Sequence, residues 1–376
     1  MTSSLRWSSR AAPPAAIVLC LVASTLALGD GVWKEAELGR PIALPADHAS
    51  HPDYKLEWWY YTGNLDAAGG RRFGYQLTFF RIGVDPAPAN PSRWAVRDLY
   101  MTHLALSDVN GRRYQFTERM NRAGPGWAGA ATDRYRVWNE DWQATIDEGG
   151  VHHLQAQTPA FGLDLHLAQE RPAALHGDHG YSRKGAAAGN ASHYYSLTRM
   201  PTRGTITLAG RAMDMTGLSW MDHEFGTSFL EPGQVGWDWF SIQLDDGRDL
   251  MIFQLRRADG SVDPRSSGTL VEPGRNTVPI TYESGFRLEP GRSWQSPVSG
   301  ARYPVGWTIR LPNPAVTLTV AAALDDQELN TERSTGVTYW EGAIDVSGTV
   351  RGRPVKGRGY LEMTGYSGMP MGRFMR

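Results

Sequence analysis

The residues best suited to chemistry lie in the stretch GLSWMDHEFGTSFLEPGQVGWDWF. On an extended strand side chains alternate between two faces, so Asp222 and Glu224 are expected to share one face with Trp220. Met221 and His223 are expected to point the other way. An acid beside a tryptophan and facing an apolar interior is poorly solvated, which raises its pKa and can keep it protonated near neutral pH. Asp222, Glu224 and His223 are therefore the catalytic candidates, and the predicted role is general acid.

The tryptophans of this stretch have a matching role. An indole face stabilises a cationic centre that is dry and close. Acid and rings together suit protonation of an electron-rich carbon-carbon double bond, followed by capture of the carbocation by water. The structural alternative stays open, in which the segment from Asp222 to Glu224 closes a barrel and pairs with an arginine, since such ion pairs also perturb pKa values.

Other chemistries are less well supported by the residue pattern. Adjacent Asp, His and Glu on a strand divide metal ligands between two faces, and the pair His152 and His153 does the same, so we expect no metal and no cofactor. The chain has no G-x-S-x-G elbow, which disfavours a nucleophilic hydrolase, although the Asp-His-Glu run could activate water directly. No phosphate-binding loop or dinucleotide fingerprint is present.

EWWYYTGNL is a second aromatic stretch, and its rings could either pack in the core or bind a ligand. Packing alone is one explanation, because aromatic residues favour strands. Polar residues inside apolar runs favour the other, since a few placed polar groups are typical of ligand pockets. Glu57 is expected to cap such a cavity or to pair with an arginine such as Arg81, and His103 by itself could equally be a core histidine. The candidate ligand-binding residues are Glu57, Trp58, Trp59, Tyr60, Gln76, His103, Tyr195, Trp220, Trp237, Trp239, Trp340 and Glu341.

The overall composition narrows the class of protein. The 376 residues carry 38 Lys+Arg against 39 Asp+Glu, a balance that gives no electrostatic footprint for nucleic acid or an anionic membrane surface. The 14 Trp, 42 Gly and 23 Pro suit short strands separated by turns rather than long helices. We predict an all-β protein with no nucleic-acid partner.

The N-terminus resembles an export signal. Arg6 and Arg10 precede the apolar run AIVLCLVASTLAL, which is followed by small residues up to Gly29. An uncleaved anchor is the alternative, but the run is short for a membrane span of about 20 residues. The one cysteine, Cys20, lies inside the run, so cleavage removes disulfide and thiolate chemistry. We predict a signal peptide over residues 1–29 and a periplasmic or secreted protein.

The sequence repeats itself in three places. WWYYTGNLD at Trp58–Asp66 aligns with WDWFSIQLD at Trp237–Asp245, and GLSWMD at Gly217–Asp222 aligns with GRGYLE. GYQL, from residue 74, also aligns with IFQL, from residue 252. Three matches in the same order indicate a duplication. We predict an N-terminal extension over residues 30–50, a first domain over 51–230 and a second over 231–376.

Strand and turn patterns fill both halves. FGYQLTFF alternates apolar residues from Phe73 to Phe79, and GLDLHLAQ alternates leucines from Leu163 to Leu167. Turn pairs such as Asn110-Gly111 and Arg351-Gly352 separate the runs. Many short antiparallel strands with large interior side chains favour closed or nearly closed barrels, which hold one small ligand in the mouth or interior.

The motifs HPDYKLEWWYYTGNL, FGYQLTFFR, SWMDHEFGTS, GWDWFSIQLDDGRDLMIFQLR and YWEGAIDVSG together resemble the family of AttH-like secreted proteins and carotenoid 1,2-hydratases. The likeness runs from about His51 to Tyr366. It implies two tandem lipocalin-like antiparallel β-barrel domains. It also implies a hydrophobic small-molecule ligand, such as an isoprenoid or lipid.

The activities that the resemblance implies fall into three classes. In the first, the protein hydrates a carbon-carbon double bond, with Asp222 as proton donor and Trp220, Trp237 and Trp239 as cation-stabilising rings. The second is a non-catalytic periplasmic lipid carrier that works with an ABC transporter of the Att type. The third is a secreted hydrolase.

Overall fold

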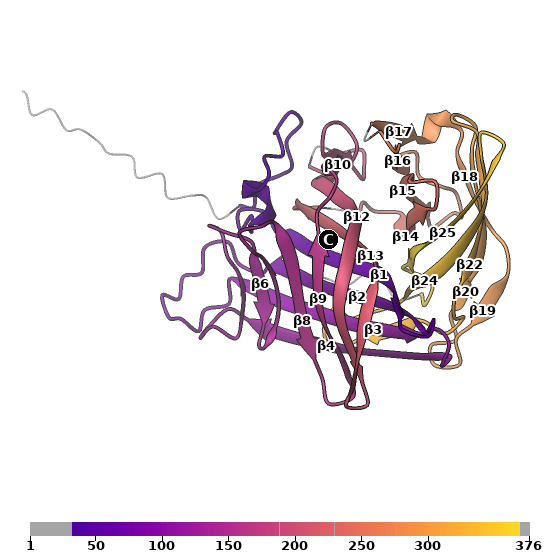
Figure 1. Ribbon diagram of the computed structural model, residues 1–376. Coiled ribbons are helices and arrows are strands. Elements are labelled where there is room, and N and C mark those ends of the chain that lie inside the picture. The colour runs from indigo at the N-terminus through magenta and orange to yellow at the C-terminus, as the bar shows by residue number, and fades with distance from the viewer. Residues whose placement is uncertain (1–31, 188, 229, 275, 369–376) are drawn as a thin grey trace, which may run out of the picture. The chain divides into compact units, whose positions relative to one another are not determined.

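The computed structural model describes residues 32–368 apart from 188, 229 and 275. The predicted signal peptide, residues 1–29, lies outside the described residues. From Trp33 on, the described residues form one compact unit built of antiparallel strands (Figure 1). None of the helical turns in this part of the chain has the length and apolar character of a membrane-crossing helix.

The first sheet contains thirteen strands in the order β4-β3-β2-β1-β13-β12-β9-β8-β7-β6-β5, with β10 and β11 both paired to β12. Its strands are β1 (Leu56–Ala67), β2 (Arg72–Gly83), β3 (Asp98–Asp108), β4 (Arg113–Arg122), β5 (Ala128–Ala130), β6 (Arg136–Asn139), β7 (Trp142–Ile146), β8 (Val151–Gln157), β9 (Phe161–Ala168), β10 (Ala174–Leu175), β11 (Tyr181–Arg183), β12 (Ala191–Leu208) and β13 (Arg211–Gly226).

The second sheet contains ten strands in the order β17-β16-β15-β14-β25-β24-β22-β21-β18, with β23 paired to β24. Its strands are β14 (Gln234–Leu244), β15 (Asp249–Arg257), β16 (Ser267–Val271), β17 (Thr277–Thr281), β18 (Arg287–Pro290), β21 (Gly306–Leu311), β22 (Val316–Ala322), β23 (Glu328–Thr331), β24 (Val337–Val350) and β25 (Arg353–Met363). The remaining elements are a hairpin of β19 (Ser293–Gln295) and β20 (Arg302–Pro304), and two short 3₁₀ turns, η1 (Ala46–His48) and η2 (Tyr282–Ser284).

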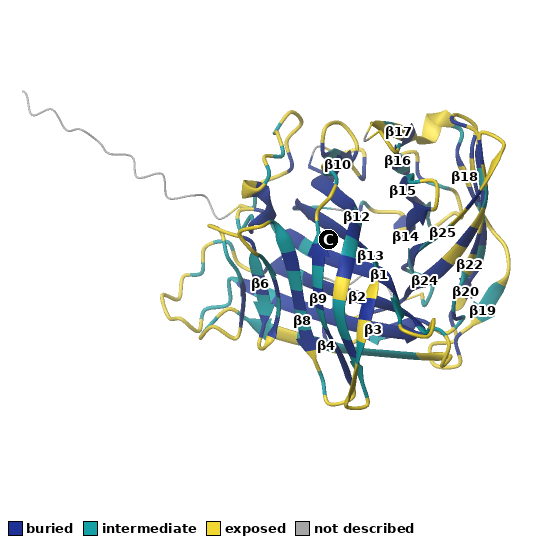
Figure 2. Cartoon of the chain, in the orientation of Figure 1, coloured by how far each residue is buried: buried dark blue, intermediate teal, exposed yellow. Residues whose placement is uncertain are grey.

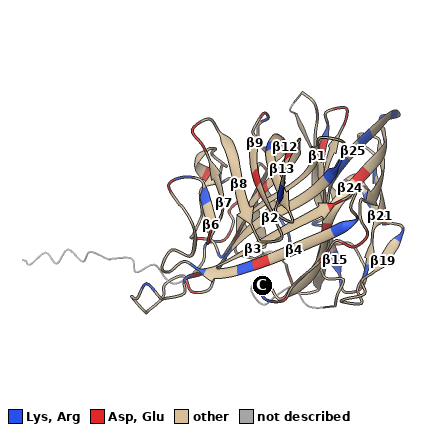
Figure 3. Cartoon of the chain, turned by 60° about the horizontal axis from the view of Figure 1, so that its bottom comes forward, with Lys and Arg blue, Asp and Glu red and all other residues tan. Residues whose placement is uncertain are grey.

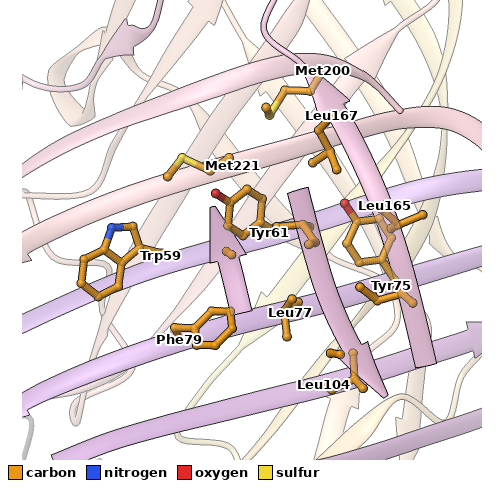
Figure 4. Packing of buried hydrophobic residues seen from close by; sticks show 14 of the residues in the cluster. Trp59, Tyr61, Tyr75, Leu77, Phe79, Leu104, Leu165, Leu167, Met200 and Met221 are labelled. Atoms are coloured by element: carbon orange, nitrogen blue, oxygen red, sulfur yellow. The ribbon is translucent and has the colours of Figure 1, made fainter. Parts of the chain in front are cut away.

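Each sheet curls around its own apolar core, as the alternating patterns predict. In the first sheet the core contains the residues expected on one face of β2, from Phe73 to Phe79, and the leucines of β9. Figure 4 shows part of this core, where Trp59 and Tyr61 pack near Met221. The second core contains Phe240, the β24 residue Trp340 and many aliphatic residues. The predicted all-β fold with nearly closed antiparallel barrels is confirmed.

Side chains, not a backbone ladder, bridge the two ends of the first sheet. Asn139 on β6 accepts a hydrogen bond from Asn121 Nδ2 on β4 at 2.7 Å and donates from its own Nδ2 to Thr102 Oγ1 at 3.1 Å. The Asn139 backbone carbonyl also accepts from Arg119 Nη1 at 3.1 Å. Asn139 is fully buried, so these bonds satisfy a polar group that would otherwise destabilise the fold.

Two of the three predicted repeat matches occupy equivalent positions in the strand pairs of the two sheets. Tyr60 of β1 lies opposite Asp222 of β13, and the aligned residues Trp239 of β14 and Glu362 of β25 also lie opposite each other. The GYQL and IFQL match is wrong. Tyr60 pairs with Thr78, whereas Trp239 pairs with Phe253. Both hairpins have loops of four residues, 68–71 and 245–248, but the strand after Tyr60 is longer than the strand after Trp239, and this shifts the alignment by three residues.

The two sheets pack closely at β2 and β24. A Cβ on Gly74 would lie 2.7 Å from Ala343 Cβ, so only glycine permits this approach. Asn64 Nδ2 donates to the Gly359 carbonyl at 3.1 Å, which joins β1 to β25. Figure 2 shows mostly buried residues along the strands in this region. The sheets thus share one compact unit, and the predicted division into domains at residue 230 stays a prediction.

Surface charge and turns follow the sequence pattern. Acidic and basic residues are interspersed along the chain in the view of Figure 3, consistent with the formal net charge of -1. The predicted turn at Arg351-Gly352 joins β24 to β25 with φ of 51° and 76°, as a two-residue hairpin turn requires.

A buried ion pair stabilises the end of the first barrel. Arg81 Nε lies 3.0 Å from Glu57 Oε2, and neither side chain is exposed. Arg81 also donates to Asp98 Oδ1 at 3.0 Å and to the Tyr54 carbonyl at 2.8 Å. The predicted pairing of Glu57 with Arg81 is confirmed.

Replacing Arg81 with methionine should lower the free energy of unfolding by about 3–5 kcal/mol, because two carboxylates lose their buried partner. Urea unfolding measures this change. Arg292→Met is the matched control: Arg292 pairs with Asp325, their side chains are 54% and 41% exposed, and the expected loss is about 0–1 kcal/mol. Equal losses in the two variants would contradict a stabilising role for the buried pair.

Candidate functional site

An aromatic cavity lies between the facing sides of the two sheets, not inside either barrel as the sequence interpretation expected. Its volume is about 110 Å³. The first sheet contributes Trp58, Tyr60, Gln76, Thr78, Phe80, His103, Tyr194, Asp222 and Glu224. The second sheet contributes Trp237, Trp239, Phe253, Leu255, Val337, Tyr339, Glu341 and Glu362. Connecting segments and strand ends add Lys184, Leu230, Thr335 and Thr364.

Strand alternation decides which predicted residues reach this cavity. Trp58 and Tyr60 line it, whereas Trp59 and Tyr61 pack into the first barrel. On β13 the cavity face carries Asp222 and Glu224, as predicted. The aromatic stretch of β1 therefore serves both purposes that the sequence left open, with alternate rings in the core and in the cavity wall.

Asp222 is a buried acid held by three hydrogen-bond donors. Trp220 Nε1 donates to Oδ1 and the Tyr194 hydroxyl to Oδ2, each at 2.6 Å, and the Ser196 hydroxyl also donates to Oδ1. Burial raises the pKa of Asp222 to about 7, although these three bonds oppose the rise. Within the described residues Asp222 has no ion-pair partner, so the arginine pair of the structural alternative is not what holds it.

A second layer of hydrogen bonds orients this acid. His176 Nε2 lies 2.6 Å from Ser196 Oγ, and Nδ1 lies 2.9 Å from Thr269 Oγ1. Burial and the charge of Lys184 lower the pKa of His176 to about 3, so its ring is neutral, with one nitrogen that donates and one that accepts. The Asp222–Ser196–His176 chain can thus reverse its donors when Asp222 gains or loses a proton.

Glu224 has a different environment from Asp222 although both face the cavity. Lys184 Nζ lies 3.0 Å from Glu224 Oε1, and the Ser192 hydroxyl donates to the same oxygen. The Lys184 ammonium also lies 4.5 Å from the centre of the Phe253 ring. Because Glu224 is engaged in an ion pair whereas Asp222 has only neutral donors, Asp222 is the better candidate proton donor of the two.

Four predicted residues lie away from the cavity, in the interior of the first barrel: Glu57, Trp59, Tyr195 and His223. His223 Nε2 bonds Glu57 Oε1 and His223 Nδ1 bonds the Tyr195 hydroxyl, both at 3.0 Å, while the Trp59 ring stacks on His223. Burial raises the pKa of Glu57, but bonds from His223 and His51 hold it well below its usual range. The alternation of β1, β12 and β13 turns these side chains inward, so His223 does not contact the ligand space that Asp222 faces.

Trp340 and Trp220 also lie outside the direct lining. Trp340 is buried in the second core, and its Nε1 donates to the Asp325 carbonyl at 2.7 Å. Trp220 lies beside Asp222 and packs edge-to-face against Trp239 at 6.3 Å between ring centres. Trp239 Nε1 in turn donates to the Tyr194 hydroxyl at 3.0 Å, which joins the second sheet to the acid.

Sequence reasoning missed a carboxyl pair on the second sheet. Glu362 was not among the candidates, and it lies opposite the predicted Glu341 on the neighbouring strand. Burial and the charge of Glu362 raise the pKa of Glu341 well above its usual range. Burial raises the pKa of Glu362 to about 7, with the Trp237 bond opposing the rise and the charges of Asp222 and Glu224 adding to it. The sequence repeat could have identified Glu362 as a candidate, because Glu362 aligns with Asp222.

His103 belongs to a chain of polar groups that leads from the cavity toward the protein exterior. Its Nδ1 lies 2.7 Å from the Tyr339 hydroxyl and its Nε2 lies 2.9 Å from Ser334 Oγ. Ser334 donates to Glu118, a partly exposed residue of β4. Gln76 Nε2 reaches the same Tyr339 hydroxyl at 3.3 Å. Both predicted residues, Gln76 and His103, therefore contribute polar groups to the cavity wall.

Two groups of side chains have metal-ligand spacing among the described residues. His51, Glu57 and His223 form the first, but Arg81 already lies against Glu57 and the donors around it are engaged. The second group is His153, Asp164 and His166 on the exposed side of β8 and β9. Neither group faces the cavity, so neither supplies a metal to Asp222.

Two curled, nearly closed antiparallel sheets, each around its own apolar core, define a lipocalin-like protein. Residues 35–366 match the AttH-like family. A solved AttH structure from Nitrosomonas europaea is 35% identical, with a TM-score of 0.81, and the match covers 89% of this chain and 99% of that one. The chain belongs to the AttH-like family, which confirms the resemblance found in the motifs.

Kievitone hydratases are more distant relatives. The enzyme from Fusarium solani subsp. phaseoli is 24% identical over 182 residues, which covers 46% of this chain and 49% of that protein. The chain therefore matches about half the length of that relative. The crystal structure of kievitone hydratase from Nectria haematococca is 14% identical with a TM-score of 0.69, covering 89% of this chain and 96% of that one. At that identity the likeness shows the fold alone.

The raised pKa of Asp222 predicts how stability depends on pH. Between the usual value of 3.8 and the folded value of about 7, the folded protein binds this proton more tightly than the unfolded chain does. The free energy of unfolding should therefore fall as the pH rises through this window. The loss from Asp222 is on the order of 4 kcal/mol, at about 1.4 kcal/mol per pKa unit.

Urea unfolding at about pH 4.5 and about pH 7.5 measures this loss. The Asp222→Asn variant should lose less stability than wild type between these values, because the amide does not titrate. Asp214→Asn, an exposed change on the same strand, should keep the wild-type loss. If Asp222→Asn lost as much as wild type, the assigned proton would belong to another group.

Proposed function

We propose that this protein hydrates a carbon-carbon double bond of an isoprenoid or related lipid-like molecule by acid catalysis, with Asp222 as proton donor. The observation that carries the proposal is a buried acid without an ion-pair partner among the described residues, placed in the wall of an aromatic cavity. Its pKa of about 7 keeps a useful fraction protonated near neutral pH.

The chemistry follows from the groups around Asp222. Transfer of its proton to one alkene carbon forms a carbon-hydrogen bond and leaves a carbocation on the other carbon, which the faces of rings such as Tyr60 and Trp239 stabilise. The carboxylate that remains keeps its three donors, and such bonds are stronger to a charged acceptor. Addition of water and loss of one of its protons complete the hydration.

The size of the cavity supports a small reacting group. A cavity of about 150 Å³ accepts one benzene molecule, and this cavity measures about 110 Å³. The volume suits the end of a chain, such as one branched five-carbon isoprenoid unit, with the rest of the molecule extending out of the cavity. Addition of water as the reaction class agrees with the name of the distant relative, kievitone hydratase.

A non-catalytic lipid carrier is the second candidate. The AttH-like family assignment and the ring-lined cavity favour it, since binding needs the rings but not the acid. In this proposal the protein is exported through residues 1–29 and works in the periplasm beside an ABC transporter. The third candidate, a secreted hydrolase, has a serine-histidine pair in Ser196 and His176, but Ser196 is fully buried and does not line the cavity.

Asp222→Asn should lower hydration of isoprenoid alcohols such as geranylgeraniol by about 10²–10⁴-fold, the usual contribution of a positioned acid. Binding of the same alcohol should be nearly unchanged. In the wild type, activity should fall as the pH rises above about 7, because Asp222 must be protonated. Product formation is measured by mass spectrometry, with Asp214→Asn as the matched control. Full activity in Asp222→Asn would exclude Asp222 as the donor.

Native purification separates the enzyme from the carrier. The mature protein is purified from its own host under mild conditions, and its organic extract is analysed by mass spectrometry. We expect a discrete isoprenoid or lipid. If that molecule stays bound unchanged and no panel compound gains water, the carrier candidate replaces the hydratase.

A further inference from the structure

The duplicated strands bring a second acidic centre to the same cavity. Asp222 lies opposite Tyr60 in the first sheet, and Glu362 lies opposite Trp239 at the equivalent position of the second. Glu341 of β24 lies directly opposite Glu362 of β25. All three carboxyl side chains line the cavity. The cavity wall thus carries one acid from the first sheet and a carboxyl pair from the second.

The carboxyl pair is held differently from Asp222. Asp222 has three hydrogen-bond donors, whereas the Glu341 carboxyl has the Tyr60 hydroxyl beside it and its Oε1 forms no well-aligned hydrogen bond in the described part of the chain. Neither Glu341 nor Glu362 forms an ion pair with any described residue. A buried carboxyl group with so few donors can accept a further hydrogen bond from a molecule in the cavity, such as water.

Two carboxyl groups at directly opposite strand positions do not both ionise easily, and such a pair holds one shared proton with one negative charge. The raised pKa values of both groups agree with this state. The ionisable groups around the pair lie on both sheets and in one connecting segment: Asp222 and Glu224 of β13, Tyr60 of β1, Tyr114 of β4, Tyr339 of β24, Tyr360 of β25, and Lys184 in the cavity wall. A pair with one proton and one negative charge can accept one more proton.

We propose that the Glu341–Glu362 pair is the base of the reaction, which takes the proton from the water that adds to the carbocation. This step rests on the proposed function. The proton of Asp222 forms the new carbon-hydrogen bond, and the water oxygen forms the carbon-oxygen bond. One water proton passes to the carboxyl pair, which becomes neutral. Return of that proton to Asp222 through solvent restores both centres, so no other reactant is consumed.

Azide tests this role because it is a nucleophile that needs no base. The test protein is the full mature chain carrying Glu341→Gln and Glu362→Ala, which removes the shared charge and opens space beside the cation. Geranylgeraniol is the probe, with and without sodium azide. We expect hydration to fall by about 100-fold or more. Azide should add to the same carbon and yield the organic azide, detected by mass spectrometry.

Three controls interpret the result. Asp222→Asn should give neither alcohol nor azide product, because no cation forms. Glu341→Gln with Glu362→Gln, which keeps the side-chain volume, should also lose hydration. Glu289→Ala removes an exposed carboxyl of the second sheet and should behave as wild type.

The outcomes separate the two proposals. Loss of hydration together with formation of the organic azide in the Glu341→Gln, Glu362→Ala variant supports the carboxyl pair as the base. Wild-type hydration in both double variants, or loss of hydration without azide capture in a protein that keeps its wild-type circular dichroism, would overturn it. If the wild type hydrates no isoprenoid of the panel, the proposed function itself fails, and this inference fails with it.

Discussion

The packing of one curled sheet against another is the constraint on which the rest of this structure depends. It buries the outer faces of β1, β2 and β13 together with those of β14, β24 and β25. These strands already pack against a core on their inner faces, so they have two buried sides. Each polar group on these strands therefore needs a hydrogen-bond partner, and burial shifts the pKa of each acid among them. The rings reduce the water around the acids, and this is why Asp222 can hold a proton near pH 7.

The two faces of β1 and β13 satisfy this constraint in different ways. On the inner face, Glu57 is charged and surrounded by donors, including Arg81 at 3.0 Å, which makes it a structural anion. On the outer face, Asp222 has neutral donors only, and burial raises its pKa to about 7. Two acids on adjacent strands thus differ in ionisation, because one has a cation beside it and the other is buried without one.

The sequence predicted the fold well because the fold depends on local periodicity. Alternation in FGYQLTFF and GLDLHLAQ identified the core face of β2 and β9, and alternation in β13 put Asp222 and Glu224 on one side. The pattern in β1 could not show which of its two sides lines the cavity, because both sides are aromatic and both are buried. The cavity was expected inside a barrel for the same reason: strand patterns do not reveal how one sheet docks on another. Lys184, which pairs with Glu224, lies in a connection without periodicity.

The repeated strand pairs place two acidic centres of different character in one cavity. A copied strand pair presents its acid at the same register, but the neighbours of that acid depend on the rest of each half. In the first half, β12 supplies Tyr194 and Ser196, whose hydroxyls stabilise the carboxylate of Asp222. In the second half the neighbouring strand β24 supplies another carboxyl, Glu341, which opposes ionisation of Glu362. The first position therefore has the surroundings of a proton donor and the second has a carboxyl neighbour with which it can share a proton, which is the combination that the proposed hydration needs.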